Sequence, residues 1–452
     1  MAAATVGRVP LASLGTALLI VACAVALRAT NAVTSRSGRW CLLFSVSFAF
    51  LLAVRTDPRL VAFNVIAAVL LLIVAAIGPS RIYDWKPLQL CNDALSIAFQ
   101  PFVMLGDLAA PGTDTGTDAP VHRSERRRLV IGLIQGAVIA VPLLIVLAAL
   151  LVSADAVFAD LLSRGQFDAG QLWYAALRFS VGSIAILVLL GRTVRSRTEV
   201  PATGISLDRL PTLVVLGALN AIFGLFVVAQ LYALTSAGEQ ILIDAGLTYR
   251  DYARQGFFQL LWVSGLTLLV LLSLRSAAEG WFGGDRWFRW SSLTTIVLTF
   301  GVVVVAFGRL QLYIADDGLT PLRFYSSVFS IWVAIGFVIV AVRLLGWRAS
   351  TAWTLPALVA SGLMVLVVLN LINPEARIAD NLVARQDADV VIHMQKLTAD
   401  GQLVMARDLD QINLTWRGAV ATQLCRNVPA DDQWLSWNLG RSRARSTLLE
   451  LC

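Results

Sequence analysis

Seven polar side chains could together bind an anionic or zwitterionic group such as a lipid headgroup. They are two aspartates, one tyrosine and four arginines: Asp155, Arg178, Tyr249, Arg250, Asp251, Arg254 and Arg323. Guanidinium groups bind phosphates and carboxylates through paired hydrogen bonds, so this set predicts a ligand pocket. The alternative is a ring of ion pairs that only fixes the register of neighbouring helices.

Arg178 is the most constrained of these residues because it stands well inside an apolar run. An unpaired charge at that depth in a membrane costs at least a few kcal/mol. We therefore expect Arg178 to face other helices and to pair with Asp155 or Asp160, the nearest carboxylates before it. Arg250 and Arg254 are four residues apart and share one face of a helix.

The arginines accompany three similar turns, in which an aspartate stands two residues before a glycine. The turns are Asp168–Gly170, Asp244–Gly246 and Asp316–Gly318, and Gln-Leu-Tyr precedes the second and third of them, at residues 230–232 and 311–313. The pattern favours a duplicated pair of helices. Chance similarity between short apolar segments is the alternative.

The second and third turns also carry residues that begin helices. Thr248 and Thr320 stand where a hydroxyl can accept a hydrogen bond from a free backbone amide of the first turn. Pro321 follows at the first helical position, where its missing N–H costs nothing. Gly246 and Gly318 permit a tight turn just before each cap. We expect these two glycines and two threonines to be structural caps.

The elements that position these residues are predicted to be membrane helices. The chain is 58% hydrophobic and 14% charged, whereas soluble proteins are about a quarter charged. Long apolar runs indicate membrane-spanning helices, so we predict an all-α integral membrane protein with about ten transmembrane helices. The ten runs are residues 9–27, 40–54, 60–77, 129–152, 172–190, 210–234, 256–274, 291–307, 325–345 and 353–372.

The first run has a second interpretation as a signal peptide, because residues 30–32 resemble a small-residue cleavage site. Arg28, Arg36 and Arg39 follow it, which is more typical of a cytoplasmic loop. The topology below therefore treats the first run as a retained helix.

Composition divides the chain into four segments. Residues 1–78 hold N-terminal transmembrane helices, 79–128 a cytoplasmic loop, 129–372 a seven-helix core with repeats, and 373–452 a helical C-terminal tail. The loop is predicted to contain an interfacial helix at Pro87–Val103, because apolar and polar residues alternate there at helical spacing.

The tail is predicted to contain two amphipathic helices, at residues 413–427 and 433–451. A segment of about 80 residues can barely support a core of its own, so we expect it to dock on the membrane part. Its apolar residues Trp434, Trp437, Leu449 and Leu451 could pack on the protein or on the bilayer.

The distribution of positive charge predicts the orientation. The N-terminus and the loops after even-numbered runs hold 8 arginines and lysines, and the loops after odd-numbered runs hold 18. The richer set should be cytoplasmic, which places both termini and the three acidic turns outside. Cys425 and Cys452 could form a disulfide only in that extracytoplasmic setting.

No cofactor or metal site is predicted. His122 and His393 are the two histidines and stand far apart, so a zinc site is excluded. Asp316 and Asp317 could hold a divalent cation, but solvated loop carboxylates explain them more simply. The net charge of +7 lies mostly in loops between apolar runs, which is better explained by orientation in the membrane than by nucleic-acid binding. The expected partners are membrane lipid and other envelope proteins, and not nucleic acid.

Three segments resemble a family of bacterial multi-pass membrane proteins that is known only as a domain of unknown function. They are Ser153-Ala-Asp-Ala-Val-Phe158, Tyr249-Arg-Asp-Tyr-Ala-Arg-Gln-Gly-Phe-Phe258 and Asn373-Pro-Glu375, and the tail sequence Trp434–Arg441 is similar too. The resemblance covers about residues 120–452. It implies a multi-pass membrane topology in the bacterial cell membrane and implies no activity.

Three functions fit these features. A non-enzymatic sensor, scaffold or assembly protein of the envelope is favoured, because the motifs gather on one side of the membrane. A transporter or lipid-translocating protein is the main alternative, supported by Arg178, Asn220 and Pro142 within apolar runs. A membrane-embedded transferase would need an outer carboxylate such as Asp155 or Asp316 as its base, and no nucleophile accompanies either in the sequence.

Overall fold

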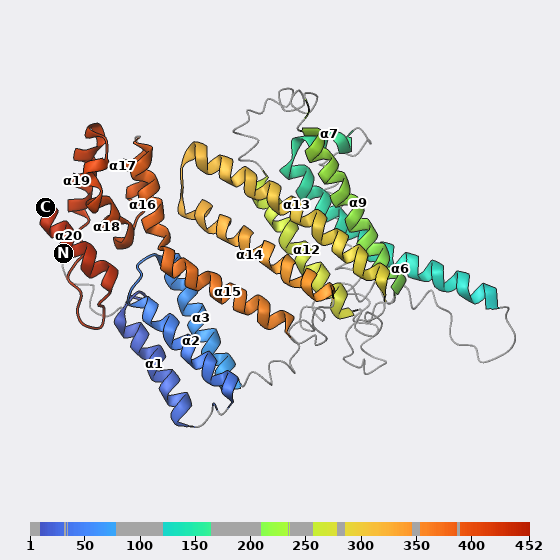
Figure 1. The fold of residues 1–452 in the computed structure, drawn as a ribbon, viewed down its shortest axis with the longest axis horizontal. Coiled ribbons are helices and arrows are strands. Elements are labelled where there is room, and N and C mark those ends of the chain that lie inside the picture. The colour runs from blue at the N-terminus through green and yellow to red at the C-terminus, as the bar shows by residue number, and fades with distance from the viewer. Residues whose placement is uncertain are drawn as a thin grey trace, which may run out of the picture. The chain divides into compact units, whose positions relative to one another are not determined.

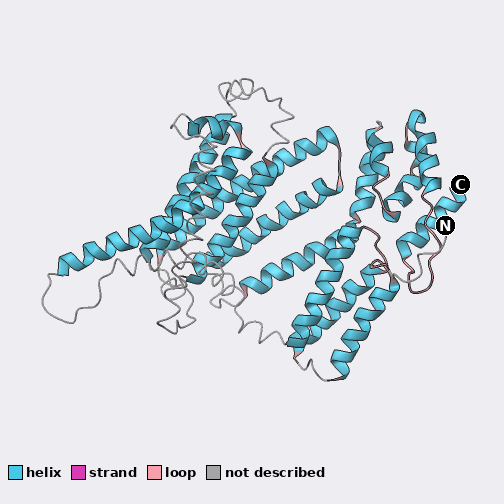
Figure 2. Cartoon of the chain, turned by 180° about the vertical axis from the view of Figure 1, so that it is seen from behind, coloured by secondary structure: helices cyan, strands magenta, loops and turns pink. Residues whose placement is uncertain are grey.

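The computed structural model describes residues 10–30, 33, 35–77, 121–163, 209–233, 235, 256–277, 285–345, 353–386 and 389–452. These residues form helices joined by turns, and no strand occurs among them (Figure 2). The all-helical class predicted from composition is therefore what the described part of the chain shows.

Seven helices in the described residues are long and apolar enough to cross a membrane. They are α3 (Pro58–Ile77), α6 (Val121–Ala154), α9 (Arg209–Ala233), α12 (Phe257–Ala277), α13 (Arg286–Asp317), α14 (Pro321–Leu344) and α15 (Thr354–Ile372). At most half of the spanning stretch of any of them is buried inside the protein. Lipid is the environment that such apolar exposed surfaces require.

The predicted number of about ten spanning helices is not established by these seven. Two further apolar runs form shorter helices, α1 (Leu14–Ala29) and α2 (Arg36–Leu52). The run 172–190 and the interfacial helix expected at 87–103 lie outside the described residues.

Two helices extend beyond their apolar runs. The sequence predicts that the eighth run ends before Arg309, because a charge usually marks the edge of a span, but α13 continues through this arginine to Asp317. Helix α6 starts at Val121, so its first turns include Arg126–Arg128, which composition places in the loop. Charged residues do not stop a helix when its backbone hydrogen bonds can continue.

Contacts divide the chain into two compact units, each built from segments far apart in sequence. The first unit contains residues 1–85, 314–332 and 355–452, and the second contains residues 86–313 and 333–354. The four-segment division by composition remains a prediction.

In the first unit, α1, α2 and α3 lie side by side (Figure 1). Ala49 of α2 and Ala68 of α3 are fully buried, and small residues of this kind let helix backbones approach closely. The Ser45 hydroxyl donates a 2.8 Å hydrogen bond to the Ala68 carbonyl. Leu366 of α15 joins the same apolar cluster, so this helix packs on the α1–α3 group.

The tail forms five α-helices and one short 3-10 helix. They are α16 (Pro374–Arg385), α17 (Asp389–Met394), α18 (Ala399–Arg407), η2 (Leu409–Gln411), α19 (Leu414–Arg426) and α20 (Leu439–Leu451), which Figure 1 shows as one group. Ile378, Met405, Leu424 and Leu448 from four of these helices share one buried cluster. The tail therefore has an apolar core of its own, besides the contacts with membrane helices described below.

The predicted helix at 433–451 begins later, at Leu439, because the preceding residues form a turn. The Asn438 side chain accepts a 3.2 Å hydrogen bond from the Arg441 amide and caps α20. The helix predicted at 413–427 agrees with α19.

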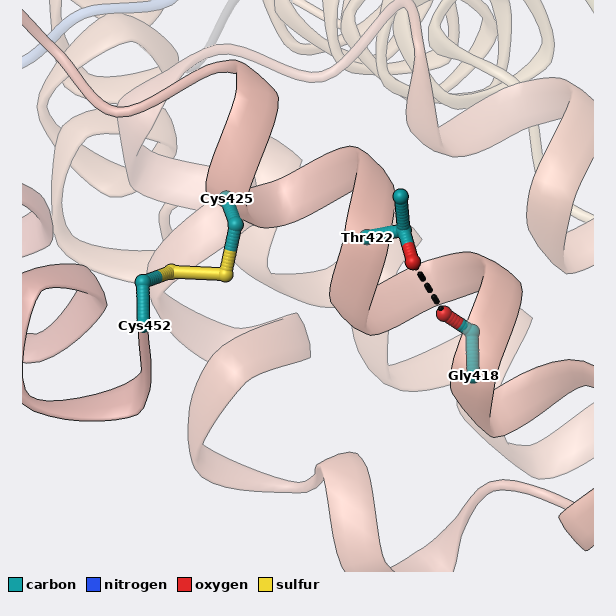
Figure 3. Close-up of a disulfide and its surroundings, with 4 residues drawn as sticks. All are labelled: Gly418, Thr422, Cys425 and Cys452. Atoms are coloured by element: carbon teal, nitrogen blue, oxygen red, sulfur yellow. Dashed lines mark hydrogen bonds between the residues drawn. A yellow bond between two sulfur atoms is a disulfide. The ribbon is translucent and has the colours of Figure 1, made fainter.

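A disulfide joins Cys425 at the end of α19 to Cys452 after α20, with their Cα atoms 5.7 Å apart (Figure 3). Beside it in α19, the Thr422 hydroxyl donates a 2.8 Å hydrogen bond to the Gly418 carbonyl. The disulfide connects α20 to α19 and so to the core of the tail.

In the second unit, α6 packs against α9 and α12, and the short helix α7 (Ala156–Ser163) follows α6 directly. Gly136 of α6 permits the closest approach, because a Cβ atom at this position would lie 2.7 Å from the Val214 side chain and 3.0 Å from the Pro211 backbone. Glycine thus brings α6 and α9 together.

Candidate functional site

The second unit contains a buried ion pair between Asp155 and Arg309. Asp155 separates α6 from α7 and is 1% exposed, and Arg309 lies in α13 and is 5% exposed. An Arg309 guanidinium nitrogen hydrogen-bonds to a carboxylate oxygen of Asp155, and another donates a 2.9 Å hydrogen bond to the Ala154 carbonyl. The pair joins the end of α6 to the middle of α13.

Further hydrogen bonds enclose this ion pair. The Gln230 amide of α9 donates to Asp155 at 2.8 Å, and Arg309 donates to the Gln230 carbonyl oxygen at 3.2 Å. The Phe158 backbone amide donates to Asp155 at 2.7 Å, so the carboxylate also caps α7. Burial alone would raise the pKa of Asp155, but the Arg309 charge and these hydrogen bonds together lower it.

Gly256 completes the site from the start of α12. Its φ angle is 80°, and a Cβ atom built there would lie 1.9 Å from the Ala154 carbonyl oxygen. Only glycine fits this position, because any side chain would overlap the backbone that carries Asp155. Residues 153–158, one of the segments that carry the sequence resemblance, therefore meet Gly256, which belongs to another of them.

Asp155 was predicted as a site residue, but its partner Arg309 and the bridging Gln230 were missed. The missed signals were an arginine directly after an apolar run, at position 309, and a glutamine in the repeated Gln-Leu-Tyr. The residues expected to complete the pocket lie outside the described residues: Arg178, Tyr249, Arg250, Asp251 and Arg254, together with the caps Gly246 and Thr248.

The first unit contains a second polar group, where the tail meets the turn between α2 and α3. The Thr56 amide donates a 2.7 Å hydrogen bond to Asp400, and the Asp400 amide donates a 3.0 Å hydrogen bond back to the Thr56 hydroxyl. The Thr56 and Thr398 hydroxyl oxygens are 2.7 Å apart. These reciprocal bonds attach the start of α18 to the α2–α3 turn.

Two more buried carboxylates surround this attachment. Glu375, in the first turn of α16, accepts hydrogen bonds from the amide and the hydroxyl of Thr398. Asp57 accepts a 2.6 Å hydrogen bond from the Tyr325 hydroxyl of α14. Asp57 and Glu375 are each 1% exposed and Asp400 is 5% exposed. We call Asp57, Glu375 and Asp400 the carboxylate cluster.

One carboxyl of the cluster, that of Glu375, has a pKa near neutral pH. Burial, together with the nearby charges of Asp57 and Asp400, raises the pKa of Glu375 to about 7, against the opposing hydrogen bonds from Thr398. Burial also raises the pKa of Asp400. Sequence reasoning did not single out these carboxylates, although Asn373-Pro-Glu375 was among the resembling segments.

Backbone and amide contacts reinforce the attachment of the tail. Asn438 donates to the carbonyls of Leu52 and Arg55 at 3.0 and 3.1 Å. The Leu439 amide donates a 2.8 Å hydrogen bond to the Ala53 carbonyl, which has no partner within α2 because it lies at the end of that helix.

Asparagines buried in the membrane helices also pair. Asn64 of α3 and Asn370 of α15 exchange two amide hydrogen bonds.

The third acidic turn, between α13 and α14, docks on α16. Gly318 has a φ angle of 81°, and the Leu319 amide donates a 2.9 Å hydrogen bond to Asn381. Thr320 directly precedes α14, and its hydroxyl accepts a 3.5 Å hydrogen bond from the Arg323 amide. The Arg323 guanidinium donates to the Asp317 and Gly318 carbonyls at 2.8 and 2.5 Å. Arg323 therefore binds its own turn.

These arrangements hold helices and the tail together through buried charge. Every polar group named in them donates to or accepts from another part of the protein. Among the described residues, no group of three or more histidines, cysteines, aspartates or glutamates is placed to hold a metal ion.

Comparison with known proteins identifies one family. The family described as Domain of unknown function (DUF4153) matches residues 16–407. The match runs from α1 to the end of α18 and ends before α19 and α20. No curated protein and no solved structure matches the chain.

Proposed function

The chain belongs to the DUF4153 family, and we propose that it is a non-enzymatic scaffold or assembly protein of the cell envelope. In this proposal the membrane helices carry the tail as a fixed module on the extracytoplasmic face, where other envelope proteins bind. The observation that carries the proposal is the attachment of the tail to several helix ends by buried polar contacts.

The helix ends that contact the tail belong together in the predicted topology. They are the start of α1, the α2–α3 turn and the start of α14, and the tail itself follows α15. With ten crossings, the loops after even-numbered runs share a face with both termini. The contacts therefore agree with the alternation on which the predicted orientation depends.

The disulfide supports the extracytoplasmic side. Disulfides persist in oxidising compartments and are rare in the cytosol. Cys425 and Cys452 form such a bond within the tail. Together with the arginine-rich loops on the opposite face, this bond favours a tail outside the cytoplasm.

The polar side chains that could have acted in catalysis or ligand binding are hydrogen-bonded within the protein, which favours a scaffold over a catalyst. Asp155, which could have served as a base, is bound by Arg309, Gln230 and the Phe158 amide. Arg323, which could have lined an outward-facing ligand site, binds the carbonyls of its own turn. Both contacts fit the structural ion-pair interpretation of the predicted pocket.

The sidedness is tested with an impermeant maleimide on intact cells. In a chain whose Cys23, Cys41 and Cys91 are replaced by serine, Cys425→Ser frees the exposed Cys452 thiol. We expect labelling before the membrane is permeabilised, and none when the disulfide is intact. Labelling that appears only after permeabilisation would place the tail in the cytoplasm and refute the proposal.

The scaffold role is tested separately against lipid translocation in vesicles that contain the purified full chain and fluorescent phosphatidylcholine. A translocating protein would expose inner-leaflet lipid to external dithionite. We expect no faster loss of fluorescence than in protein-free vesicles. A faster loss would replace the scaffold proposal by lipid translocation, whichever face the tail occupies.

A further inference from the structure

The tail carries an exposed aromatic turn at residues 432–438, which we call the tryptophan turn. Trp434 is 70% exposed, Leu435 37% and Trp437 36%. The shape of the turn is held by its own contacts, because Asp432 accepts from the Asn438 amide at 3.2 Å and pairs with Arg441 at 3.1 Å. The exposed aromatic side chains are therefore presented by an ordered segment.

The tryptophan turn is bound to the beginning of α1. The Leu14 amide donates a 2.9 Å hydrogen bond to the Trp437 carbonyl, and the Gly15 amide donates a 2.8 Å hydrogen bond to the Leu435 carbonyl. Arg441 also donates to the Ala12 carbonyl at 3.0 Å. The first amides of a helix have no partner within it, and lipid supplies none, so these carbonyls complete the end of an apolar helix.

Helix α1 by itself is too short for a bilayer. It has 16 residues, which extend about 24 Å, whereas the hydrocarbon core is about 30 Å thick. Its exposed side chains include Leu18 and Leu19, and Leu11 is exposed just before it. The exposed apolar surface of α1 thus continues past its first residue to Leu11, beside the tryptophan turn.

We propose that the tryptophan turn binds the boundary between headgroups and acyl chains of a phospholipid bilayer, and so anchors the tail to the membrane surface. Indole rings favour this boundary because they combine an apolar body with an N–H donor. The hydrogen bonds to α1 fix the turn at the depth where that helix enters the membrane. This inference requires only that the α1–α3 group lies in the membrane, and it holds for either orientation of the tail.

The test is fluorine NMR of the full chain, labelled with 5-fluorotryptophan, in nanodiscs of phosphatidylcholine and phosphatidylglycerol. The variants Trp434→Phe and Trp437→Phe assign the fluorine resonances of these two tryptophans. Trp416→Phe assigns the resonance of a control tryptophan in α19, a helix that packs on other tail helices. The turn is held through backbone carbonyls and through Asp432, so these conservative changes leave its contacts in place. The probes are a nitroxide on the lipid headgroup and a soluble gadolinium chelate.

We expect the lipid nitroxide to broaden the Trp434 and Trp437 resonances and to leave the Trp416 resonance sharp. Broadening of Trp434 by gadolinium without broadening by the lipid nitroxide would place the turn in water and overturn the proposal. Protection of Trp434 from both probes would mean that protein covers it, either a second copy or another subunit, and would overturn the proposal equally.

Discussion

The Thr56 amide donates a 2.7 Å hydrogen bond to a carboxylate oxygen of Asp400, 344 residues later in the chain. The Asp400 amide returns a bond to the Thr56 hydroxyl, so the start of α18 and the α2–α3 turn satisfy each other's polar groups. Buried donors and acceptors that lose a partner are costly. This pair therefore makes the position of the tail depend on a turn near the N-terminus.

Replacement of Asp400 by alanine should loosen the tail. Asp400→Ala leaves the buried Thr56 amide without its acceptor, which should cost about 1–3 kcal/mol of folding free energy. The measurements are the midpoint of thermal unfolding in detergent and the rate of proteolysis within the tail. The control Asp410→Ala removes a carboxylate that is 98% exposed and should change neither. Equal effects of the two variants would show that the Thr56 contact contributes nothing.

The stability of the chain should decrease as the pH rises from about 4.5 to about 7. Glu375 has a raised pKa in the folded state, so the folded chain binds its proton more tightly than the unfolded chain does. The stabilisation is complete below pH 4.5 and is lost as the pH passes the folded-state pKa of about 7.

The Glu375→Gln variant should lose its part of this dependence, because the amide resembles the protonated acid and can still accept from Thr398. Thermal midpoints across the pH range provide the measurement, with Glu450→Gln on the exposed face of α20 as the control. Asp400 shifts in the same direction, so some dependence should remain. A Glu375→Gln profile parallel to that of the wild type would contradict the prediction.

The Arg309–Asp155 pair should be far more sensitive to mutation than an exposed ion pair in the same unit. Arg309→Met leaves a buried carboxylate without its cation, which should cost about 3–5 kcal/mol. The double variant Arg309→Met with Asp155→Asn should recover part of this loss. Arg209→Met breaks the pair with Asp285 at its exposed partner, since Arg209 is 56% exposed, and leaves Asp285 as the cap of α13, so it should cost at most about 1 kcal/mol. The free energies of unfolding of these three variants in detergent provide the measurement, and similar losses at both pairs would refute the distinction.

Replacement by alanine should have opposite effects on stability at Gly256, directly before α12, and at Gly265, within it. Gly256→Ala would push a methyl group into the Ala154 carbonyl and should prevent normal folding or displace Asp155. Gly265→Ala adds a methyl group where no atom lies within 4 Å, and alanine is the better helix former by about 1 kcal/mol. The yield of monodisperse protein and the thermal midpoint provide the readout. A well-folded Gly256→Ala variant would show that the approach to Ala154 can relax.

Loss of the disulfide should destabilise the tail without affecting the membrane helices. The bond closes a loop across a sequence separation of 27 residues, and loops of this size correspond to about 3 kcal/mol. Cys452→Ser should therefore lower the stability of α19 and α20 to hydrogen exchange, while α2 and α3 keep their protection. Cys23→Ser, at an exposed free cysteine, is the control. Unchanged exchange in α19 would show that the apolar core alone holds the tail.

The membrane helices were predictable from sequence wherever a single run of apolar residues is enough to define a helix. The runs at 60–77, 210–234 and 353–372 agree closely with α3, α9 and α15. A helix must be about 20 apolar residues long to cross hydrocarbon, and this requirement is local in the chain. Prediction failed at the ends: α13 continues through Arg309, whose charge is neutralised by Asp155 from the junction between α6 and α7.

The amino-acid sequence by itself determined that this chain is helical, that lipid must cover much of its surface, and that the turn at Gly318–Thr320 begins a helix. Only the tertiary structure decided which polar residues meet. Asp155 pairs with Arg309 across 154 residues, and Thr56 with Asp400 across 344. The periodicity of apolar residues shows which face of a helix is buried, but not which other helix packs against that face. The identity of each partner depends on how helices distant in sequence pack, and on which carboxylate a buried donor then reaches.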